Sequence, residues 1–339
     1  MKRFLLIMGS LLMLFFTACN KELSDNFTTY TNHPLNDTAW VRNITNTSSI
    51  HDLFEMLVPP VLVDSFSLSY GGEIKFGDSV ELKFAPSTLF LPGSTSIPVG
   101  NAKIEVIPLM RKGDFIRVFK PTTTNNGALL ETGGGFFIKV SQNNNELKLL
   151  LDSTFELKFN DVDTPPKMSM QTFYGKEGFD VPLKGIDTSF FWIRDFDTTK
   201  LEPWSKISNN PLVPSYFGYK MKSKNLRWIT ADRYADSSQQ KTKITAILSP
   251  NFTNKNTAVF VVFNNQKTVV NLKGDYPSRS FNTNNIPVGI SMKLLSLSKI
   301  GSQLYLGVKA ISTGTVVTSY TIVPTERSLK EIIDYLKSL

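Results

Sequence analysis

The sequence has 339 residues, a formal net charge of +8, and 41% hydrophobic and 19% charged residues. This composition is typical of a globular protein, and the length suits about two domains. The positive charge is spread along the chain and forms no basic patch of the kind that binds nucleic acid, so we expect no nucleic-acid partner. Cys19 is the single cysteine, which excludes an intramolecular disulfide.

The chain begins with a pattern typical of a bacterial lipoprotein signal. Lys2-Arg3 precedes the apolar run Phe4–Phe16, and the small residues Thr17-Ala18 precede Cys19. The run is shorter than the ~20 residues that a membrane-spanning helix needs. We therefore predict that residues 1–18 are a signal peptide and that Cys19 carries fatty acids such as palmitate, which anchor the protein to a membrane. The alternative is an ordinary secreted protein, cleaved after another small residue.

The segment after the cysteine is polar. Residues 20–49 are rich in Asn, Thr and Ser, and we predict that residues 19–58 form a flexible tether. Ser48–Leu57 could form one short helix, which Pro59-Pro60 would end. His33 and His51 both lie in this segment, and we interpret them as surface histidines without a special role.

A period-two pattern begins at Val61 and predicts β-strands. Gly, Pro, Asn and Asp clusters separate the runs at short spacing, which favours an antiparallel sandwich over residues 59–162. We place a linker at Asp161–Pro166, because consecutive prolines disfavour both helix and central strand. The clearest runs are Ile74–Phe76, Val80–Phe84, Ala102–Ile107 and Phe136–Val140.

Strand patterns return after an irregular stretch between Met168 and Asp236. They are clearest in Thr242–Leu248, Ala258–Phe263 and Gly289–Leu297, so a second sandwich is predicted over residues 163–323. The predicted fold class is therefore all-β, with two antiparallel β-sandwich (Ig-like) domains and a C-terminal amphipathic α-helix.

The last segment, residues 324–339, has a different pattern. Ser328 and Glu331 form a capping box, and apolar residues follow at helical spacing. The simplest interpretation is a helix that packs on a sheet face, and the alternative is a docking helix for a partner.

Three consecutive glycines, Gly133–Gly135, permit a β-bulge or a strand entry. No strand–turn–helix pattern and no Lys-Ser/Thr pair follow them, so they do not form a phosphate-binding loop.

Several segments resemble a group of cell-envelope lipoproteins of Bacteroidetes bacteria, which contain a β-sandwich module similar to that of zonula-occludens, netrin-receptor and ankyrin proteins. The resemblance implies a β-sandwich fold and an outer-membrane location, on its periplasmic or surface face, and it implies no activity. Thr230, Ala231 and Tyr234 differ from the residues that the group has at those positions. The segments are Gly100–Val106, Pro121–Thr123, Gly127–Gly135, Trp228–Tyr234, Pro250–Thr253, Ile286–Gly289 and Gln303–Gly307.

The sequence offers little for catalysis, and we predict that the protein is not an enzyme. No cysteine remains as a nucleophile, and a Ser-His-Asp triad would need a histidine from the tether. No His-Glu-x-x-His motif or calcium loop occurs, so we expect neither a metal nor another cofactor. A pair of distant carboxylates, as in glycoside hydrolases, stays open as the alternative.

Binding is the stronger hypothesis. Aromatic residues gather in the irregular stretch, and Trp192, Trp204, Tyr216 and Trp228 could stack on sugar rings, although such residues often belong to a core. We predict a non-catalytic binding or scaffold module with a protein or glycan partner in the envelope. The alternative is a carbohydrate-processing enzyme or its glycan-binding accessory protein.

Replacement of the cysteine tests the anchor. Cys19→Ser removes the only thiol that can carry lipid, so the variant should leave the membrane fraction for the soluble fraction of lysed cells. Ser10→Ala, within the apolar run, is the control and should stay with the membranes. A Cys19→Ser protein that still sediments with membranes would contradict the prediction.

Overall fold

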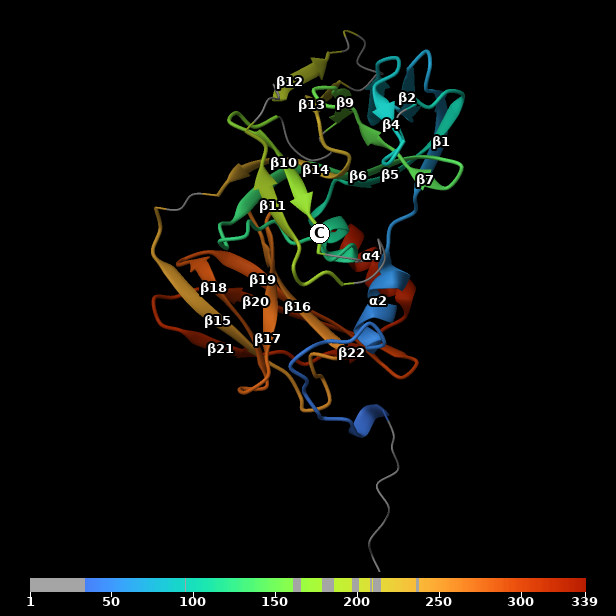
Figure 1. Ribbon diagram of the computed structural model, residues 1–339. Helices are drawn as coiled ribbons and strands as arrows, with labels where there is room; N and C mark the ends of the chain where they lie inside the picture. Colours follow the sequence, from blue (N-terminus) through green and yellow to red (C-terminus); the bar gives the residue numbers. More distant parts are fainter. Residues whose placement is uncertain are drawn as a thin grey trace, which may run out of the picture. The chain divides into compact units, whose positions relative to one another are not determined.

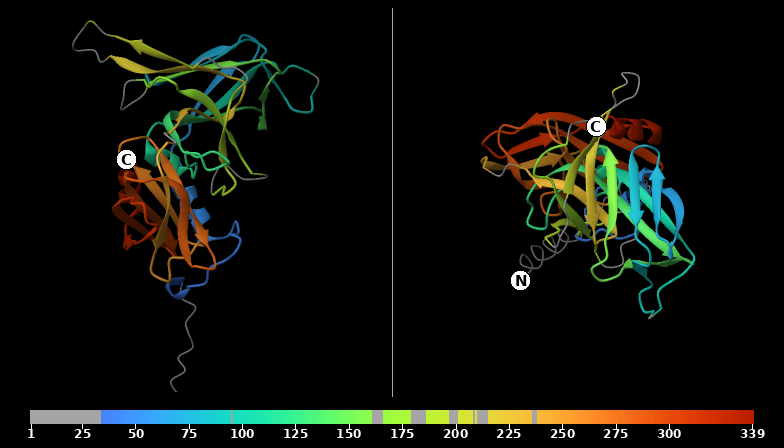
Figure 2. Two further views of the ribbon diagram at one scale, coloured as in Figure 1. Left: turned by 90° about the vertical axis from the view of Figure 1, so that its left-hand side faces the viewer. Right: turned by 90° about the horizontal axis from the view of Figure 1, so that it is seen from above.

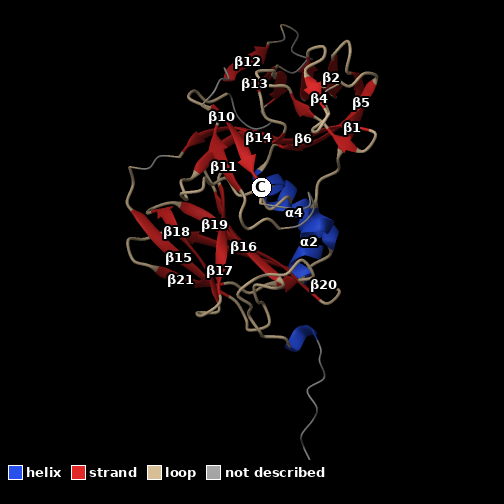
Figure 3. Ribbon diagram, in the orientation of Figure 1, coloured by secondary structure: helices blue, strands red, loops and turns tan. Residues whose placement is uncertain are grey.

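The computed structural model describes residues 34–94, 96–160, 166–178, 186–196, 201–207, 209, 215–235 and 238–339. Strands make up 50% of it and helices 10%, so the predicted all-β class with a C-terminal helix is confirmed (Figure 3). The chain divides into residues 1–37, of which the short 3-10 helix η1 (Pro34–Asn36) is described, and residues 38–339.

Two antiparallel sheets and a small ribbon form the first part of this unit (Figure 1). The first sheet contains, in spatial order, β1 (Leu62–Ser67), β5 (Asn101–Leu109), β6 (Leu130–Gln142), β14 (Arg227–Tyr234), β10 (Gln171–Lys176) and β11 (Phe191–Arg194), and β7 (Asn145–Glu146) pairs with β6. The second sheet contains β12 (Leu201–Lys206), β13 (Tyr216–Ser223), β9 (Phe155–Asn160), β3 (Val80–Phe84) and β2 (Gly72–Phe76). The ribbon pairs β4 (Leu89–Phe90) with β8 (Lys148–Leu149).

These two sheets enclose one apolar core. Alternate residues of a strand point to the same face, and Phe136 and Ile138 of β6 share a buried cluster with Leu82 and Leu157 of the second sheet. Phe137, between them, belongs to a different cluster on the other face of the first sheet, beside α3 (Lys112–Arg117). The two sheets therefore form a sandwich, and β6 is buried on both faces.

The glycine run forms a β-bulge, as predicted. Ala231 pairs with Gly134 and Asp232 pairs with Thr132, which leaves Gly133 as the extra residue of β6. A Cβ atom at Gly133 would lie 2.6 Å from a ring carbon of Tyr219, so a side chain has no room there.

The remaining strands form one continuous eight-stranded sheet. Figure 2 shows these orange and red strands gathered apart from the strands of the sandwich. Ile244 and Ile311 come from well-separated strands of the spatial order, yet they share one buried cluster, so the sheet curves around its own core. In spatial order the strands are β21 (Thr318–Thr321), β15 (Lys241–Ile247), β18 (Ser280–Pro287), β17 (Val269–Asp275), β16 (Thr257–Phe263), β19 (Ser291–Ile300), β20 (Gln303–Ser312) and β22 (Thr325–Glu326).

Three helices cover the outer face of this sheet. Val259 and Val261 of β16 point into the sheet's own core, whereas Phe260 points to α2 (Ser49–Leu57) and α4 (Leu329–Lys337). The rings of Phe54 and Phe119 meet edge to face at 5.0 Å, and both approach Phe260. Apolar burial on both faces explains why every residue of β16 is buried.

The predicted boundary at residues 162/163 needs correction. Strands β10–β14 follow it in the sequence, yet β14 pairs with β6 and β13 pairs with β9. The sheets of the first sandwich therefore continue to Tyr234, and the eight-stranded sheet begins at Lys241.

The predicted tether, residues 19–58, is also wrong over its second half. Asn254 of the eight-stranded part donates from its side-chain amide to the Val41 carbonyl oxygen at 2.6 Å and accepts from the Val41 N–H. Trp40 is buried against Phe281, and Ile50 of α2 is fully buried. The apolar residues of α2 recur at helical spacing, which gives the helix a face that must pack.

The predicted signal peptide, residues 1–18, and Cys19 lie outside the described residues. Among the described helices, none has the length and apolar character needed to cross a membrane.

The C-terminal helix packs as predicted. Ser328 caps it by accepting from the Glu331 N–H, and the Glu331 carboxylate accepts from the Ser328 N–H at 2.8 Å. Ile332 and Leu336 are fully buried, and α4 approaches α3 so closely that a Cβ at Gly113 would overlap the Leu336 carbonyl oxygen.

Truncation of the buried face of α4 tests this packing. Ile332→Ala and Leu336→Ala should each lower the free energy of unfolding by about 2–4 kcal/mol, because each leaves a cavity under the helix. Urea denaturation followed by fluorescence measures the effect. Lys330→Ala, on the exposed side, is the matched control, and equal stability of all three variants would refute the packing.

A buried carboxyl lies at the bulge. Asp232 is fully buried, and one of its oxygens accepts from the Thr230 hydroxyl at 2.7 Å. Burial raises the pKa of Asp232 to about 7, and hydrogen bonds from Thr230 and Thr132 oppose this rise. The carboxyl is therefore neutral in the folded protein at mildly acidic pH, where the unfolded chain is already ionised.

This raised pKa predicts a pH-dependent stability. The contribution of Asp232 to the free energy of unfolding is fully present below about pH 4, and it is lost as the pH rises through about 7. Asp232→Asn keeps the shape without the ionisation, so it should stabilise the protein at pH 8 by roughly 1–3 kcal/mol, less as the pH falls. Thermal unfolding between pH 5 and 8 checks this. The control Asp78→Asn, at an exposed position, should leave the pH dependence of stability unchanged. An unchanged pH dependence in Asp232→Asn would contradict the prediction.

Candidate functional site

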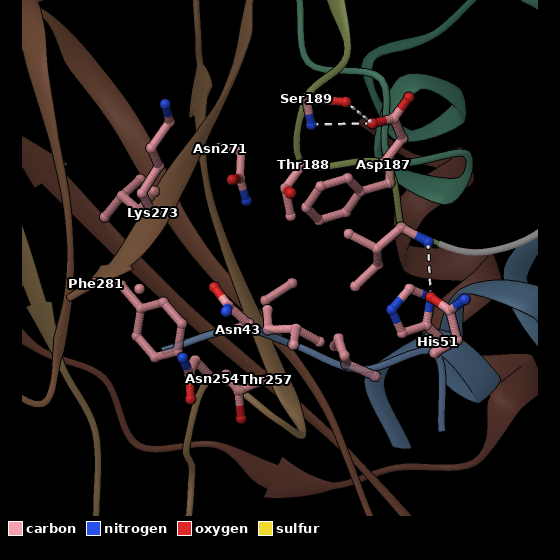
Figure 4. A pocket seen from close by; sticks show the side chains of 18 of the residues that line it. Asn43, His51, Asp187, Thr188, Ser189, Asn254, Thr257, Asn271, Lys273 and Phe281 are labelled. Atoms are coloured by element: carbon pink, nitrogen blue, oxygen red, sulfur yellow. Dashed lines mark hydrogen bonds between the residues drawn. The ribbon is translucent and has the colours of Figure 1, made fainter. Parts of the chain in front are cut away.

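Three neighbouring hollows lie beside β17 and β18. The loop before β11 lines the first two, and residues 126–129 line the third. The first has a volume of about 500 Å³ and is lined by residues from six separate segments. In Figure 4, Lys273 and Phe281 lie on one side of this hollow, and Asp187 and His51 lie on the other. Its polar lining residues are Arg42, Asn43, Asn46, His51, Asp187, Thr188, Ser189, Asn254, Thr257, Asn271 and Lys273.

The other two hollows adjoin the first. The second, of about 460 Å³, shares Asp187–Ser189, Asn271 and Lys273 with it and adds residues 282–285 of β18. The third, of about 300 Å³, shares Asn126 and Asn285 with the second. Because each hollow shares walls with the next, we treat the three as one feature, the junction cleft.

Asparagine side chains dominate the polar lining of the junction cleft. Asn43, Asn125 and Asn284 are exposed, and within the described part of the chain their amides make no hydrogen bond. Each amide offers two donors and one acceptor oxygen. The cleft therefore presents paired donors and acceptors that the protein itself does not use.

Local backbone geometry presents these amides. The Thr124 hydroxyl accepts from the Ala128 N–H at 3.1 Å, and the Thr124 carbonyl oxygen accepts from the Gly127 N–H, which closes a tight turn that carries Asn125. Gly127 has a φ of 77°, the left-handed region that glycine adopts without strain. Asn285 also has a positive φ, next to a register shift between β15 and β18.

One short segment fixes the walls of the cleft relative to each other. The Trp192 indole donates to the Pro121 carbonyl oxygen at 3.0 Å, and the Trp192 N–H donates to the Thr123 carbonyl oxygen. Thr122 lies between them and bonds to Val269, the first residue of β17, through both backbone and hydroxyl. The loop before β11 and strand β17 are therefore both tied to residues 121–123.

Asp187 shapes the loop that forms one wall. One carboxylate oxygen accepts from the N–H and the hydroxyl of Ser189 at 2.9 and 2.6 Å, and the other accepts from the Gly178 N–H. Burial acts to raise the pKa of Asp187, but these hydrogen bonds and the nearby Lys120 outweigh it and leave the pKa lowered. The carboxylate is thus ionised and already bonded on both oxygens.

Lys120 is buried behind this loop. Its ammonium lies 4.4 Å from the ring centre of Phe190 and 5.2 Å from that of Trp228. Burial lowers its pKa to about 8, although Asp187 acts to raise it. The lysine is 3% exposed and holds the loop through these contacts.

His51, which we interpreted as a surface residue, lines the first hollow from α2. Its Nδ1 accepts from the Ile186 N–H at 3.3 Å, which requires an unprotonated nitrogen. Burial lowers its pKa, while Glu55 and Asp52 act to raise it. The imidazole thereby links α2 to the loop before β11.

The structure corrects the predicted aromatic site. Trp192 and Trp228 are 0% and 1% exposed and pack in the cluster beside α3, so neither ring can stack on a sugar. Trp204 and Tyr216 are half-buried on β12 and β13, in the other sheet of the sandwich. The Trp204 indole donates to the Phe159 carbonyl oxygen, and Lys158 lies over its ring. The four residues therefore do not form one site.

The described part of the chain offers no metal-binding group of three or more His, Cys, Asp or Glu residues. Among the described residues that line the junction cleft, Asp187 is the single carboxylate.

Comparisons with known proteins assign neither a family nor a function to the chain. No protein-family model, no curated protein and no solved structure matches the chain. The resemblance to envelope lipoproteins stays a prediction.

The residues of the cleft were not singled out from the sequence. Asn125-Asn126 and Asn284-Asn285 are short amide clusters between strand patterns, and such clusters normally indicate only turns. Their closeness in space depends on the pairing of β17 with β18 and on the bonds of Thr122, which sequence patterns do not reveal.

Proposed function

We propose that this protein is a non-catalytic, lipid-anchored module of the cell envelope that binds a glycan in the junction cleft. The observation that carries the proposal is the set of exposed asparagine amides without partners among the described residues, gathered in adjoining hollows. Volumes of 300–500 Å³ lie within the range typical of small-ligand pockets.

The chemistry of the lining favours a sugar. A hydroxyl group both donates and accepts, and an asparagine amide can satisfy both functions side by side. Tyr276, which lines none of the three hollows, is 43% exposed, and the Arg42 guanidinium lies over its ring at 5.8 Å from the ring centre.

A protein partner bound as an added strand is disfavoured at this place. Such a partner needs the free edge of a sheet. β17 lies between β16 and β18, and β18 lies between β17 and β15, so the backbone of both strands is already paired. Recognition at the cleft therefore depends on side chains and on loop backbone.

The alternative, a carbohydrate-processing enzyme, finds less support here. Glycoside hydrolases of the usual kind need two carboxyl groups. Asp187 is the carboxylate that lines the described cleft, and both its oxygens accept hydrogen bonds from Ser189 and Gly178.

The anchor completes the proposal. Lipid on Cys19, placed in the outer membrane as the resemblance implies, would keep the cleft at the cell envelope. A glycan of the envelope or of the surroundings is then within reach.

A glycan array followed by calorimetry tests the proposal. The triple variant Asn43→Ala, Asn125→Ala and Asn284→Ala should bind the array's best ligand roughly tenfold or more weakly, because each lost hydrogen bond is worth about 1 kcal/mol. The exposed Asn101→Ala, on β5 and away from the cleft, is the matched control and should bind as the unaltered protein does. Absence of any array hit, or equal binding by the triple variant, would refute the proposal.

A further inference from the structure

We infer that the ligand of the junction cleft is an acidic oligosaccharide, long enough to occupy all three hollows at once. This inference rests on the proposed glycan-binding function and adds the charge and the length of the ligand. It is carried by two observations, the distribution of charged side chains along the cleft and the lining residues that neighbouring hollows share.

Each hollow has a cation in its lining. Arg42 and Lys273 line the first hollow, Lys273 also lines the second, and Lys241 lines the third. All three side chains are exposed, and within the described part of the chain none of them forms an ion pair. The lysines are thus available to an anion in solvent, and Arg42 is held over the ring of Tyr276.

Negative charge is nearly absent from the same surface. Asp187 is the carboxylate among the described lining residues, it is 3% exposed, and its oxygens are occupied by Ser189 and Gly178. Asp275, at the end of β17, lies outside the three linings and accepts from the Ser278 hydroxyl at 2.6 Å. An anion in the cleft therefore meets cations without a competing exposed carboxylate.

The spacing of the cations favours a polymer over a single small anion. A phosphate or a monosaccharide acid would be bound best by cations that converge on one point. Here Arg42 lines the first hollow and Lys241 lines the third, and the second hollow shares lining residues with both. A chain with a carboxylate or sulfate on successive sugar rings matches this arrangement.

The charges should contribute modestly and in a salt-dependent manner. Each exposed ion pair is weak, and salt at 0.15 M screens charges over about 8 Å. Three such contacts should favour an acidic oligosaccharide over its neutral counterpart by about tenfold at low salt, and the preference should shrink in 0.5 M NaCl.

Calorimetry with the full soluble chain tests the inference. The probes are oligogalacturonides of two to eight units, alginate, hyaluronan and chondroitin sulfate oligosaccharides, and, as neutral counterparts, methyl-esterified oligogalacturonides and malto-oligosaccharides. We expect at least one acidic series to bind about tenfold more tightly than the neutral probes, with affinity that rises with length before it levels off.

Two double variants with the same change of charge provide the control. Lys241→Gln with Lys273→Gln removes cations of the cleft, and Lys83→Gln with Lys222→Gln removes exposed lysines of the sandwich. The acidic preference should disappear in the first and persist in the second.

The outcomes separate this inference from the proposed function. Equal binding of acidic and neutral oligosaccharides, or an acidic preference that survives in the Lys241/Lys273 variant, would overturn the inference and leave glycan binding standing. Affinity that does not increase beyond two sugar units would overturn the claim on length. Failure of every probe to bind would overturn the inference and the proposed function together.

Discussion

The contact between Thr122 and Val269 is the constraint on which the junction depends. The Thr122 N–H donates to the Val269 carbonyl oxygen at 2.9 Å, and the Thr122 hydroxyl accepts from the Val269 N–H at 2.9 Å. Both bonds are buried, where a hydrogen bond left unmade is costly. Nearby, the Thr268 hydroxyl donates to the Leu130 carbonyl oxygen, so the sandwich and the eight-stranded sheet are joined by a short buried ladder. The cleft is the opening beside that ladder.

The aromatic residues that we first assigned to ligand binding serve this same junction from inside. Trp192 is buried, and its indole bond to Pro121 fixes the loop before β11 next to the ladder. Trp228 and Phe190 pack around the Lys120 ammonium behind that loop. A rigid apolar support holds the exposed Thr188 and the asparagines in place, and such preorganisation lowers the entropy lost on binding.

Local patterns in the sequence were enough to predict α4 and the strands with clear alternation, such as β3, β5, β6 and β16, but not β1, β10, β12, β13 or β18. The alternation around Phe136 and the capping box at Ser328 each involve only a few neighbouring residues, so both can be recognised in the sequence. The predicted domain boundary at residue 162 was wrong because strand pairing is not local. Strand β14 pairs with β6, which lies about ninety residues earlier in the sequence. The predicted tether was wrong at α2, because the apolar face of this helix packs against β19, which lies far away in the sequence.

The cleft was hidden for a related reason. Its lining comes from many separate segments, among them α2, the loop before β11, β17 and β18. Each contributes only a few polar residues, which look like ordinary turn or surface residues in the sequence. Aromatic residues are easily noticed in a sequence. Burial of a large ring stabilises the fold strongly, however, and Trp192 and Trp228 lie in the core. Exposed asparagines without partners gain nothing from the fold that carries them. Their gathering beside unpaired cations at a rigid junction is therefore better explained by a ligand than by stability.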